Sequence, residues 1–225
     1  MLAPARCGRR DAGKAGPGTI LDDLPPDPIP RWGDRRRIRI GLLGGSFNPA
    51  HSGHRHVAEI ARRRLRLDQV WLMVSPGNPL KPVDGMGSLS ERLASARGIS
   101  DGRRFIATAI EAHLHTRYTV DTLRKLRIRF PNAHFVWLMG ADNLEQLPKW
   151  NGWREIAGRT SFAVLPRPTY NPRALAGLAA QRLRSTRLPE RRASALAGIA
   201  APAWVFMLER QNHESATAIR ARNHV

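Results

Sequence analysis

The hydrophobic positions of the chain change their spacing at intervals, and this change predicts an alternation of strands and helices. Short apolar runs that stop at glycine, proline or polar residues predict buried parallel strands, because such strands are covered on both faces. We expect six strands, at residues 38–45, 69–76, 105–112, 134–142, 160–168 and 203–209.

The segments between these runs carry apolar residues three and four positions apart, which is the spacing of one helical face. In residues 54–67 this face holds Val57, Ile60 and Leu65, while arginines occupy most of the other positions. Further helices are expected at residues 90–100, 119–130, 151–159, 172–184 and 215–222, with Ser88 or Ser90 as a candidate N-cap.

Strands that alternate with helices form βαβ units, whose strands lie parallel. We therefore predict an α/β fold, a Rossmann-like doubly wound parallel sheet with helices on both faces. Residues 37–225 are expected to form a single domain. Residues 1–36 carry many Gly, Pro and Asp residues without a hydrophobic period, which predicts a disordered N-terminal extension.

Composition narrows the class of protein. The one cysteine, Cys7, excludes an internal disulfide and a cysteine-based metal site. No apolar run approaches the ~20 residues of a membrane span. Residues 1–18 lack the continuous apolar stretch of a secretory signal, so we expect a cytoplasmic location.

The formal net charge of +19 favours anionic partners such as nucleotides, nucleic acid or a membrane surface. An arginine-rich, lysine-poor composition also follows from GC-rich coding sequence, so the charge alone leaves both explanations open. The segment at 182–192 is predicted to be a solvated face. Since the chain has no recognisable nucleic-acid-reading module, we expect neither nucleic acid nor a membrane as its partner.

The segment GGSFNPAHSGH, residues 44–54, joins the first predicted strand to the first predicted helix. Gly44 and Gly45 permit a tight turn and close approach of backbone N–H groups to a ligand. His51 precedes the helix and His54 falls in its first turn, where unpaired N–H groups and the helix dipole attract anions. Two imidazole donors there suit phosphate oxygens; the alternative is that the histidines only cap the helix.

Other motifs limit the choice of chemistry. Neither a Walker A loop nor a G-x-G-x-x-G fingerprint is present, and a zinc site would lack a third and a fourth ligand. Ser215 and Thr217 open the last predicted helix, and Arg220, one turn later, can reach the same anion. An ordinary capped helix with a solvated arginine is the alternative for this segment.

The segment at 44–54 closely resembles the phosphate-binding signature of the nucleotidyltransferases with an H-x-G-H motif. The form beginning G-S-F-N-P is similar to that of bacterial nicotinate-mononucleotide adenylyltransferases. Further segments resemble this family in order along the chain: GNPLKP (77–82), TRYTVDTLRKL (116–126), WLMGADNLEQLPKW (137–150) and ESATAIRAR (214–222). The likeness spans residues 38–222; at Ala216 the family often has a second hydroxyl residue, so one phosphate contact is in question.

The resemblance implies adenylyl transfer from ATP to nicotinate mononucleotide, with Mg²⁺ carried on ATP and no dedicated metal ligands in the protein. The residues implied in catalysis are His51, His54 and Arg220. The further residues implied in ATP binding are Gly45, Ser46, Phe47, Lys81, Ser215 and Thr217. Those implied in binding nicotinate mononucleotide are Tyr118, Thr119, Asp142, Trp150 and Arg167.

Each of these positions also has a plainer interpretation. Trp150 can stack on a pyridine ring, whereas Trp153 is expected in the core. Asp142 and Thr119 can serve as caps, and Lys81 and Arg167 can be solvated.

Two other functions remain as alternatives. One is nucleotidyl transfer, adenylyl or cytidylyl, to another phosphate acceptor such as pantetheine phosphate. The other is nucleic-acid binding without catalysis. The sequence leaves open the oligomeric state, the choice between nicotinate and nicotinamide nucleotides, and the role of residues 1–36.

Overall fold

A computed structural model describes residues 24–77, 85–167 and 170–208. Its centre is one seven-stranded sheet in the order β3-β2-β1-β4-β5-β7-β6, in which every neighbouring pair runs parallel. The strands are β1 Ile38–Gly45, β2 Gln69–Val74, β3 Phe105–Thr108, β4 Ala133–Gly140, β5 Ser161–Leu165, β6 Arg187–Leu188 and β7 Trp204–Phe206.

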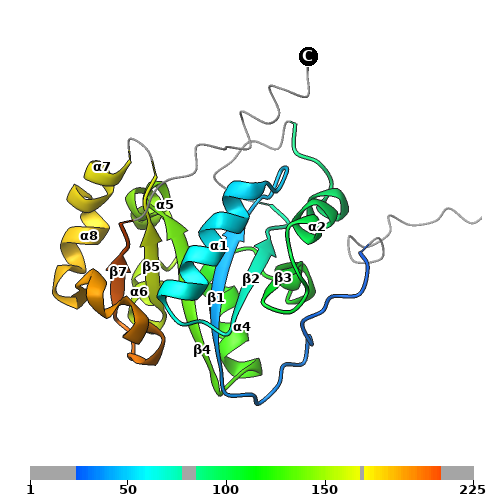
Figure 1. The fold of residues 1–225 in the computed structure, drawn as a ribbon, viewed down its shortest axis with the longest axis horizontal. Helices are drawn as coiled ribbons and strands as arrows, with labels where there is room; N and C mark the ends of the chain where they lie inside the picture. Colours follow the sequence, from blue (N-terminus) through cyan, green and yellow to red (C-terminus); the bar gives the residue numbers. More distant parts are fainter. Residues whose placement is uncertain (1–23, 78–84, 168–169, 209–225) are drawn as a thin grey trace, which may run out of the picture.

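The strand order reverses between β1 and β4. From β1 the chain moves outward through β2 and β3, then returns to β4 on the other side of β1 (Figure 1). At such a reversal the connecting segments leave the carboxyl ends of two neighbouring strands in opposite directions, and a crevice opens between them. We therefore expect the functional site beyond Gly45 and Gly140.

Helices cover both faces of the sheet. One face carries α1 (Ser52–Arg64), α2 (Leu89–Gly98) and the 3₁₀ segment η3 (Glu190–Gly198). The other carries α3 (Ile110–His113), α4 (Thr119–Arg129), α5 (Ala141–Gln146), η1 (Leu147–Lys149), α6 (Trp153–Arg159), α7 (Asn171–Ala176) and α8 (Leu178–Arg182), with the 3₁₀ turn η2 (Arg184–Thr186) after α8.

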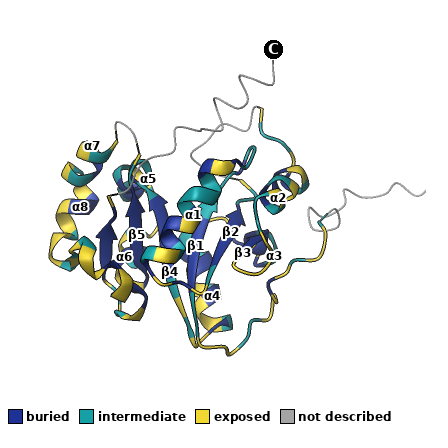
Figure 2. Cartoon of the chain, in the orientation of Figure 1, coloured by how far each residue is buried: buried dark blue, intermediate teal, exposed yellow. Residues whose placement is uncertain are grey.

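Figure 2 shows the buried strands enclosed between these two layers, which confirms the predicted α/β doubly wound fold with helices on both faces. The strands are apolar on both faces because each face has its own core: in β1, Ile40 and Leu42 pack under α4, whereas Leu43 packs under α1 and α2. None of the helices within the described ranges is long and apolar enough to cross a membrane.

Several element boundaries differ from the sequence prediction. The strand expected at 105–112 ends at Thr108, and α3 follows. The strand expected at 134–142 ends at Gly140, because the chain turns into α5 at Ala141. In both places a buried helix continues the apolar pattern of the strand, so hydrophobicity alone cannot mark the change.

The elements of the carboxyl-terminal third depart further from the sequence prediction. The helix expected at 172–184 is divided at Gly177 into α7 and α8. The segment at 182–192 contains the short strand β6 and the beginning of η3, and all its residues are exposed or partly exposed, which agrees with the predicted solvated face. The last predicted helix, 215–222, lies outside the described residues. Of the expected N-caps, Ser88 is the one used, since its Oγ accepts the Glu91 N–H at 3.2 Å.

Residues 24–36 are ordered against the domain, which corrects the expectation of a disordered extension for this part. Ile29 is buried in the core that lies between the sheet and the helix layer containing α4. Asp27 accepts hydrogen bonds at 2.7 Å from the Thr108 hydroxyl and from the Ala109 N–H, at the junction of β3 and α3. The remainder of the predicted extension, residues 1–23, lies outside the described residues.

The Asp27 contact predicts a measurable contribution to stability. Asp27→Ala is expected to lower the free energy of unfolding by about 2 kcal/mol, because it leaves the Ala109 N–H and the Thr108 hydroxyl without their acceptor. Asp34→Ala is the matched control, since Asp34 forms an exposed ion pair with Arg36 and should contribute about 0.5 kcal/mol or less. Urea denaturation of both variants tests this; equal losses would contradict the anchoring role.

Candidate active site

The turn between β1 and α1 is closely packed. Phe47 is buried and has a φ of +48°, a left-handed conformation that non-glycine residues adopt only where the surroundings hold them. A Cβ at Gly44 would lie 2.9 Å from the Trp137 indole, and one at Gly45 would lie 3.2 Å from the Phe47 ring. Packing therefore favours glycine at Gly44, while a side chain at Gly45 would require the Phe47 ring to shift.

The two histidines lie together at the start of α1. Their ring centroids are 3.9 Å apart, and the His54 ring is 4.9 Å from that of Phe47. The His51 N–H donates to His54 Nδ1 at 3.3 Å, so the neutral His54 ring carries its proton on Nε2. The capping interpretation is thus correct for His54 Nδ1, while Nε2 is the donor that the neutral ring can offer to an anion.

Helix α2 holds this turn in place through a buried arginine. The side chain of Arg92 is almost fully enclosed, and its burial lowers the pKa of the guanidinium, although an arginine keeps its charge. Its Nη1 donates to the carbonyl oxygens of Ser46 (2.9 Å) and Ser75 (2.7 Å), and its Nε donates to that of Gly87 (2.9 Å). One cation therefore ties the ends of β1 and β2 to α2.

Two further hydrogen-bonded links join the same turn to the α2 side. Ser95 Oγ accepts the Ala50 N–H at 2.9 Å, and the Asn48 amide bridges to the backbone of Gly85 and Gly87. The sequence analysis did not single out Arg92 or Ser95. The available signal is that Arg92 shares a helical face with the apolar Leu89 and Ala96.

A cavity of about 310 Å³ lies at the carboxyl edge of the sheet, where the strand order reverses. The loops after β1 and β2, the start of α4 and the segment around η1 all contribute to its wall. Of the predicted site residues it brings together Gly45, Ser46, Tyr118, Thr119 and Trp150. Residues that the sequence analysis missed include Ser75, Glu111, Arg117, Trp137, Asn143, Lys149 and Asn151.

Two tryptophans shape the cavity. Trp150 meets Trp137 edge to face, with ring centroids 6.3 Å apart and an interplanar angle of 87°. Trp137 Nε1 is buried and has no hydrogen-bond partner within the described residues. Both Trp150 and Trp153 pack against the core, as predicted for Trp153, but of the two it is Trp150 that lines the cavity. The indole of Trp150 is therefore the one positioned to contact a flat ring.

The start of α4 and a buried carboxyl form another part of the wall. The helix begins at Thr119, as predicted, but its N-cap is Tyr118 and not Thr119; the positive end of the dipole is directed at the cavity. Glu111 on α3 accepts a hydrogen bond from Thr122 Oγ1 at 3.1 Å. Burial raises the pKa of Glu111 to about 7.

The other predicted residues lie apart from the cavity wall. Asp142, in the first turn of α5, faces Arg167 Nε at 3.5 Å, and neither residue lines the cavity. Phe47, His51 and His54 follow Gly45 and Ser46 in the β1–α1 turn but do not themselves line the cavity. Lys81, Ser215, Thr217 and Arg220, together with Ala216, lie outside the described residues. Within the described ranges, His, Cys, Asp and Glu side chains form no group of three or more that could hold a metal ion.

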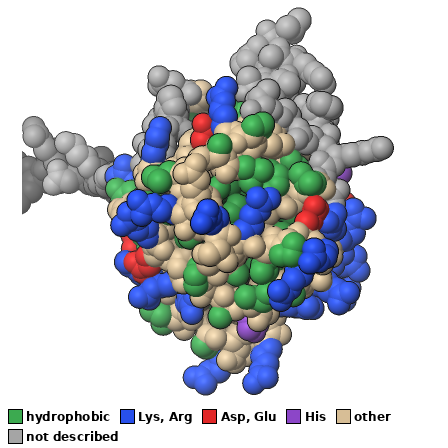
Figure 3. All heavy atoms as spheres, turned by 90° about the vertical axis from the view of Figure 1, so that its left-hand side faces the viewer, with side chains coloured by type: hydrophobic (Ala, Val, Ile, Leu, Met, Phe, Trp, Pro, Cys, Tyr) green, Lys and Arg blue, Asp and Glu red, His purple; other side chains and the backbone are tan. Residues whose placement is uncertain are grey.

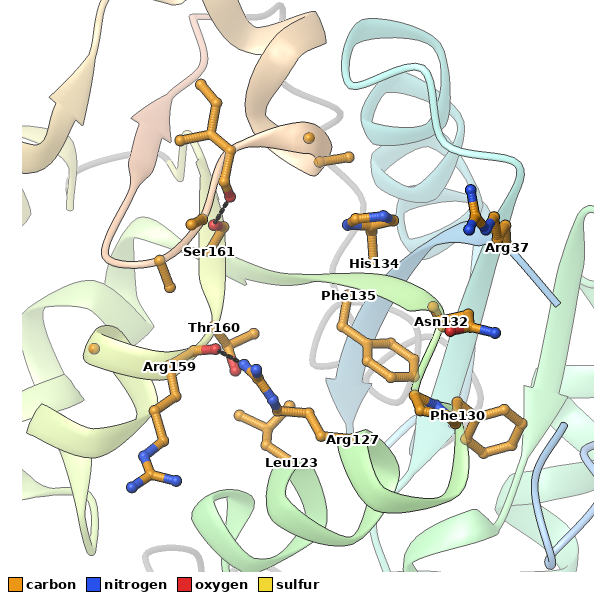
Figure 4. Close-up of a pocket in the computed structure, with 18 residues that line it drawn as sticks. Arg37, Leu123, Arg127, Phe130, Asn132, His134, Phe135, Arg159, Thr160 and Ser161 are labelled. Atoms are coloured by element: carbon orange, nitrogen blue, oxygen red, sulfur yellow. Dashed lines mark hydrogen bonds between the residues drawn. The ribbon is translucent and has the colours of Figure 1, made fainter. Parts of the chain in front are cut away.

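A larger cavity, of about 740 Å³, opens at the opposite edge of the sheet. Figure 4 shows it between the beginnings of β4 and β5, with Arg37, Arg127, His134 and Arg159 around it. The guanidinium of Arg127 donates to the carbonyl of Arg159. Because parallel sheets bind ligands at the carboxyl ends of their strands, the smaller cavity is the candidate active site.

On the face that carries α7 and α8, basic side chains are interspersed with hydrophobic and other groups (Figure 3). Figure 3 shows Lys and Arg dispersed across the face that carries α7 and α8, with no continuous basic stripe on that face. A nucleic-acid-binding surface would be expected to gather such charges on one face or along one helix.

Comparisons with known proteins agree with this geometry. A family model described as cytidylyltransferase-like matches residues 42–222. A probable nicotinate-nucleotide adenylyltransferase of Gluconacetobacter diazotrophicus is 60% identical over 193 residues, which cover 86% of this chain and 90% of that protein. One of Gluconobacter oxydans is 57% identical over 183 residues, covering 81% and 94%.

Among solved structures, the Plasmodium falciparum nicotinic acid mononucleotide adenylyltransferase complexed with NaAD aligns with a TM-score of 0.62 at 15% identity. The alignment covers 82% of this chain and 83% of that one. At this level of identity the likeness supports the fold alone.

The parallel sheet, the histidine-bearing turn at its reversal point and the matching family model define a nucleotidyltransferase of the cytidylyltransferase-like class. Its relatives at 57% and 60% identity share a narrower name. The chain belongs to the nicotinate-nucleotide adenylyltransferase family.

Proposed function

We propose that the chain transfers an adenylyl group from ATP to nicotinate mononucleotide, giving deamido-NAD and pyrophosphate. The observation that carries this proposal is the position of the cavity. It lies between the β1–α1 turn, which leads into the N-terminus of α1, and a wall that joins an indole to the start of α4. A pyridine nucleotide carries an aromatic ring and a phosphate. It can therefore contact the indole wall with its ring and the β1–α1 turn with its phosphate.

The reaction requires the protein mainly to position the two substrates and to stabilise the negative charge that develops between them. A phosphate oxygen of the mononucleotide attacks the α-phosphorus of ATP in line; a new P–O bond forms, the α–β anhydride bond breaks and pyrophosphate leaves. The attacking oxygen is already anionic, so no protein nucleophile is required. Positioning and stabilisation of the developing charge supply the rate.

The triphosphate is the ligand proposed for the β1–α1 turn. The backbone of Gly45, Ser46 and Phe47 approaches the nucleotide, while His51 and His54 donate to phosphate oxygens. Arg220, Ser215, Thr217 and Lys81 are proposed for the phosphates that leave as pyrophosphate. Mg²⁺ enters as part of the ATP substrate and retains most of its own waters.

The pyridine half is the ligand proposed for the cavity. The ring lies against Trp150, and its carboxylate faces the backbone N–H groups at the start of α4, beside Tyr118 and Thr119. The Asp142–Arg167 pair is proposed for the ribose phosphate. A pantetheine phosphate acceptor has no ring to stack, so the paired tryptophans favour a pyridine nucleotide. A cytoplasmic location remains part of the proposal.

Pyrophosphate release from ATP tests the proposed function. We expect rapid release with nicotinate mononucleotide and Mg²⁺, and at most a background rate with pantetheine phosphate or without an acceptor. Chromatography should show deamido-NAD forming in a one-to-one ratio with pyrophosphate. Equal release with either acceptor, or none with nicotinate mononucleotide, would reject the proposal.

A further inference from the structure

A buried group that the reaction scheme leaves unused lies in the wall of the pyridine cavity. Glu111 belongs to α3 and is nearly fully buried, yet it lines the cavity into which Tyr118 and Thr119 also face. Its carboxyl continues into a chain of hydroxyls. Thr122 Oγ1 lies 3.1 Å from Glu111 Oε1, and Thr116 Oγ1 lies 2.8 Å from Thr122 Oγ1.

This chain can satisfy Glu111 in either protonation state. With the carboxylate ionised, Thr122 donates to Glu111 and Thr116 donates to Thr122. With the carboxyl protonated, Glu111 donates to Thr122, whose own proton turns to the Tyr118 carbonyl at 3.3 Å. Thr116 then donates to the Glu111 carbonyl, also at 3.3 Å. A proton can therefore be gained or lost without leaving a buried polar group unpaired.

The cavity presents other ionisable groups besides Glu111. Arg117, Tyr118 and Lys149 line it with Glu111. Within the described residues none of them forms an ion pair with the carboxylate, and its one side-chain hydrogen bond comes from Thr122. Burial in this setting, with no cation paired to it, raises the pKa of Glu111 to about 7.

The charged groups on the packed elements are engaged elsewhere. On α3 itself, His113 Nε2 lies 3.8 Å from the Asp27 carboxylate. On α4, Asp121 pairs with Arg124, and Lys125 Nζ donates to the Leu114 carbonyl. The strand β2 beneath α3, with sequence QVWLMV, carries no ionisable side chain.

We propose that Glu111 is a specificity-determining residue, which takes up a proton when the carboxylate of a nicotinate nucleotide binds beside it in the cavity. This inference rests on the proposed function. Two carboxylates that lie close together in the cavity repel one another, which drives one of them to hold a proton. The neutral carboxamide of nicotinamide mononucleotide imposes no such requirement. Binding of the nicotinate form is thus linked to proton uptake and binding of the amide form is not.

The direction of the pH dependence follows from this coupling between ligand binding and protonation of Glu111. A bound anion raises the pKa of Glu111 further, so nicotinate mononucleotide binds best below about pH 7 and progressively less well above it. Between pH 6.5 and pH 8.5 we expect its Kd to rise about tenfold, since each pKa unit of coupling corresponds to a tenfold change. The phosphate group is common to both mononucleotides, so the difference between their pH profiles isolates the ring substituent.

Glu111→Gln is the decisive variant, because glutamine is neutral, nearly isosteric and still able to pair with Thr122. Its Kd for nicotinate mononucleotide, followed by quenching of tryptophan fluorescence, should change less than twofold over the same pH range. At pH 8.5 it should bind that nucleotide more tightly than the unaltered chain does. Glu59→Gln, on the exposed surface of α1, is the matched control and should keep the wild-type pH profile.

The unaltered protein supplies a second test that needs no variant. Titration calorimetry at pH 7.5 in two buffers of different ionisation enthalpy should show an uptake of about half a proton or more per nicotinate mononucleotide bound, relative to nicotinamide mononucleotide. An equal proton count for the two ligands overturns the inference, as does a Glu111→Gln profile that keeps the wild-type slope. Both results are separate from loss of the proposed function, in which pyrophosphate release itself fails.

Discussion

His54→Ala is expected to lower kcat by about 100-fold or more, the largest effect that we predict for one side chain. The ring lies in the first turn of α1, 3.9 Å from that of His51, and its Nδ1 is committed to the His51 backbone N–H. Nε2–H is then the donor proposed for a phosphate oxygen. A donor placed at developing transition-state charge contributes on the order of 100- to 1000-fold in kcat.

Steady-state pyrophosphate release at saturating substrates measures this effect directly. His56→Ala removes a neighbouring imidazole from the same helix and serves as the control, with kcat within about twofold of the unaltered enzyme. Thermal unfolding of both variants distinguishes a catalytic loss from the small cost of losing the cap at His51. A near-normal kcat for His54→Ala would remove His54 from the mechanism.

Arg92→Ala is expected to lower both stability and activity. Its guanidinium donates to three carbonyl oxygens that belong to three separate segments, at Ser46, Ser75 and Gly87. Removing it leaves these acceptors enclosed without their charged donor, which should cost about 3 kcal/mol of unfolding free energy. Because the Ser46 carbonyl lies in the turn proposed to bind phosphate, kcat/KM should also fall at least tenfold.

The matched control is Arg97→Ala on the same helix, where an exposed arginine donates to the Pro26 carbonyl. Arg92→Lys should recover little, because one ammonium group cannot reproduce the planar fork that spans several acceptors. Chemical denaturation and kcat/KM, measured together, test the prediction. If Arg92→Ala unfolds at the same denaturant concentration as Arg97→Ala, the turn does not depend on α2.

Much of the fold was predictable because it depends on short-range pattern. The apolar runs located the core of every strand except the two-residue β6, and the three-to-four spacing located α1, α2, α4 and α6. The errors cluster where a strand passes into a buried helix, as at Thr108 and at Gly140. There both elements are apolar, so hydrophobicity does not change at the boundary.

The candidate site also contains residues that the sequence located and residues that it missed. The positions of His51 before α1 and of His54 in its first turn were predicted correctly, because they belong to one continuous turn and helix whose geometry is local. Trp150, Tyr118 and Thr119 meet at the cavity, as the family resemblance implied. Glu111 and Arg92 were missed because a buried charged residue is recognised only once its partners from other elements are known.

The sequence by itself determined the α/β class, the parallel strands and the residues that open α1 and α4, because these follow from the period of apolar side chains and from local capping. The tertiary structure alone decided that Asp27 bonds to Thr108 and Ala109, 81 and 82 residues later in the chain, that Arg92 donates to the Ser46 carbonyl of the β1–α1 turn, and that Glu111 shares a cavity with Trp150. These are contacts between distant segments. Their energy comes from burying polar groups with partners, and a one-dimensional pattern does not record which segments will meet.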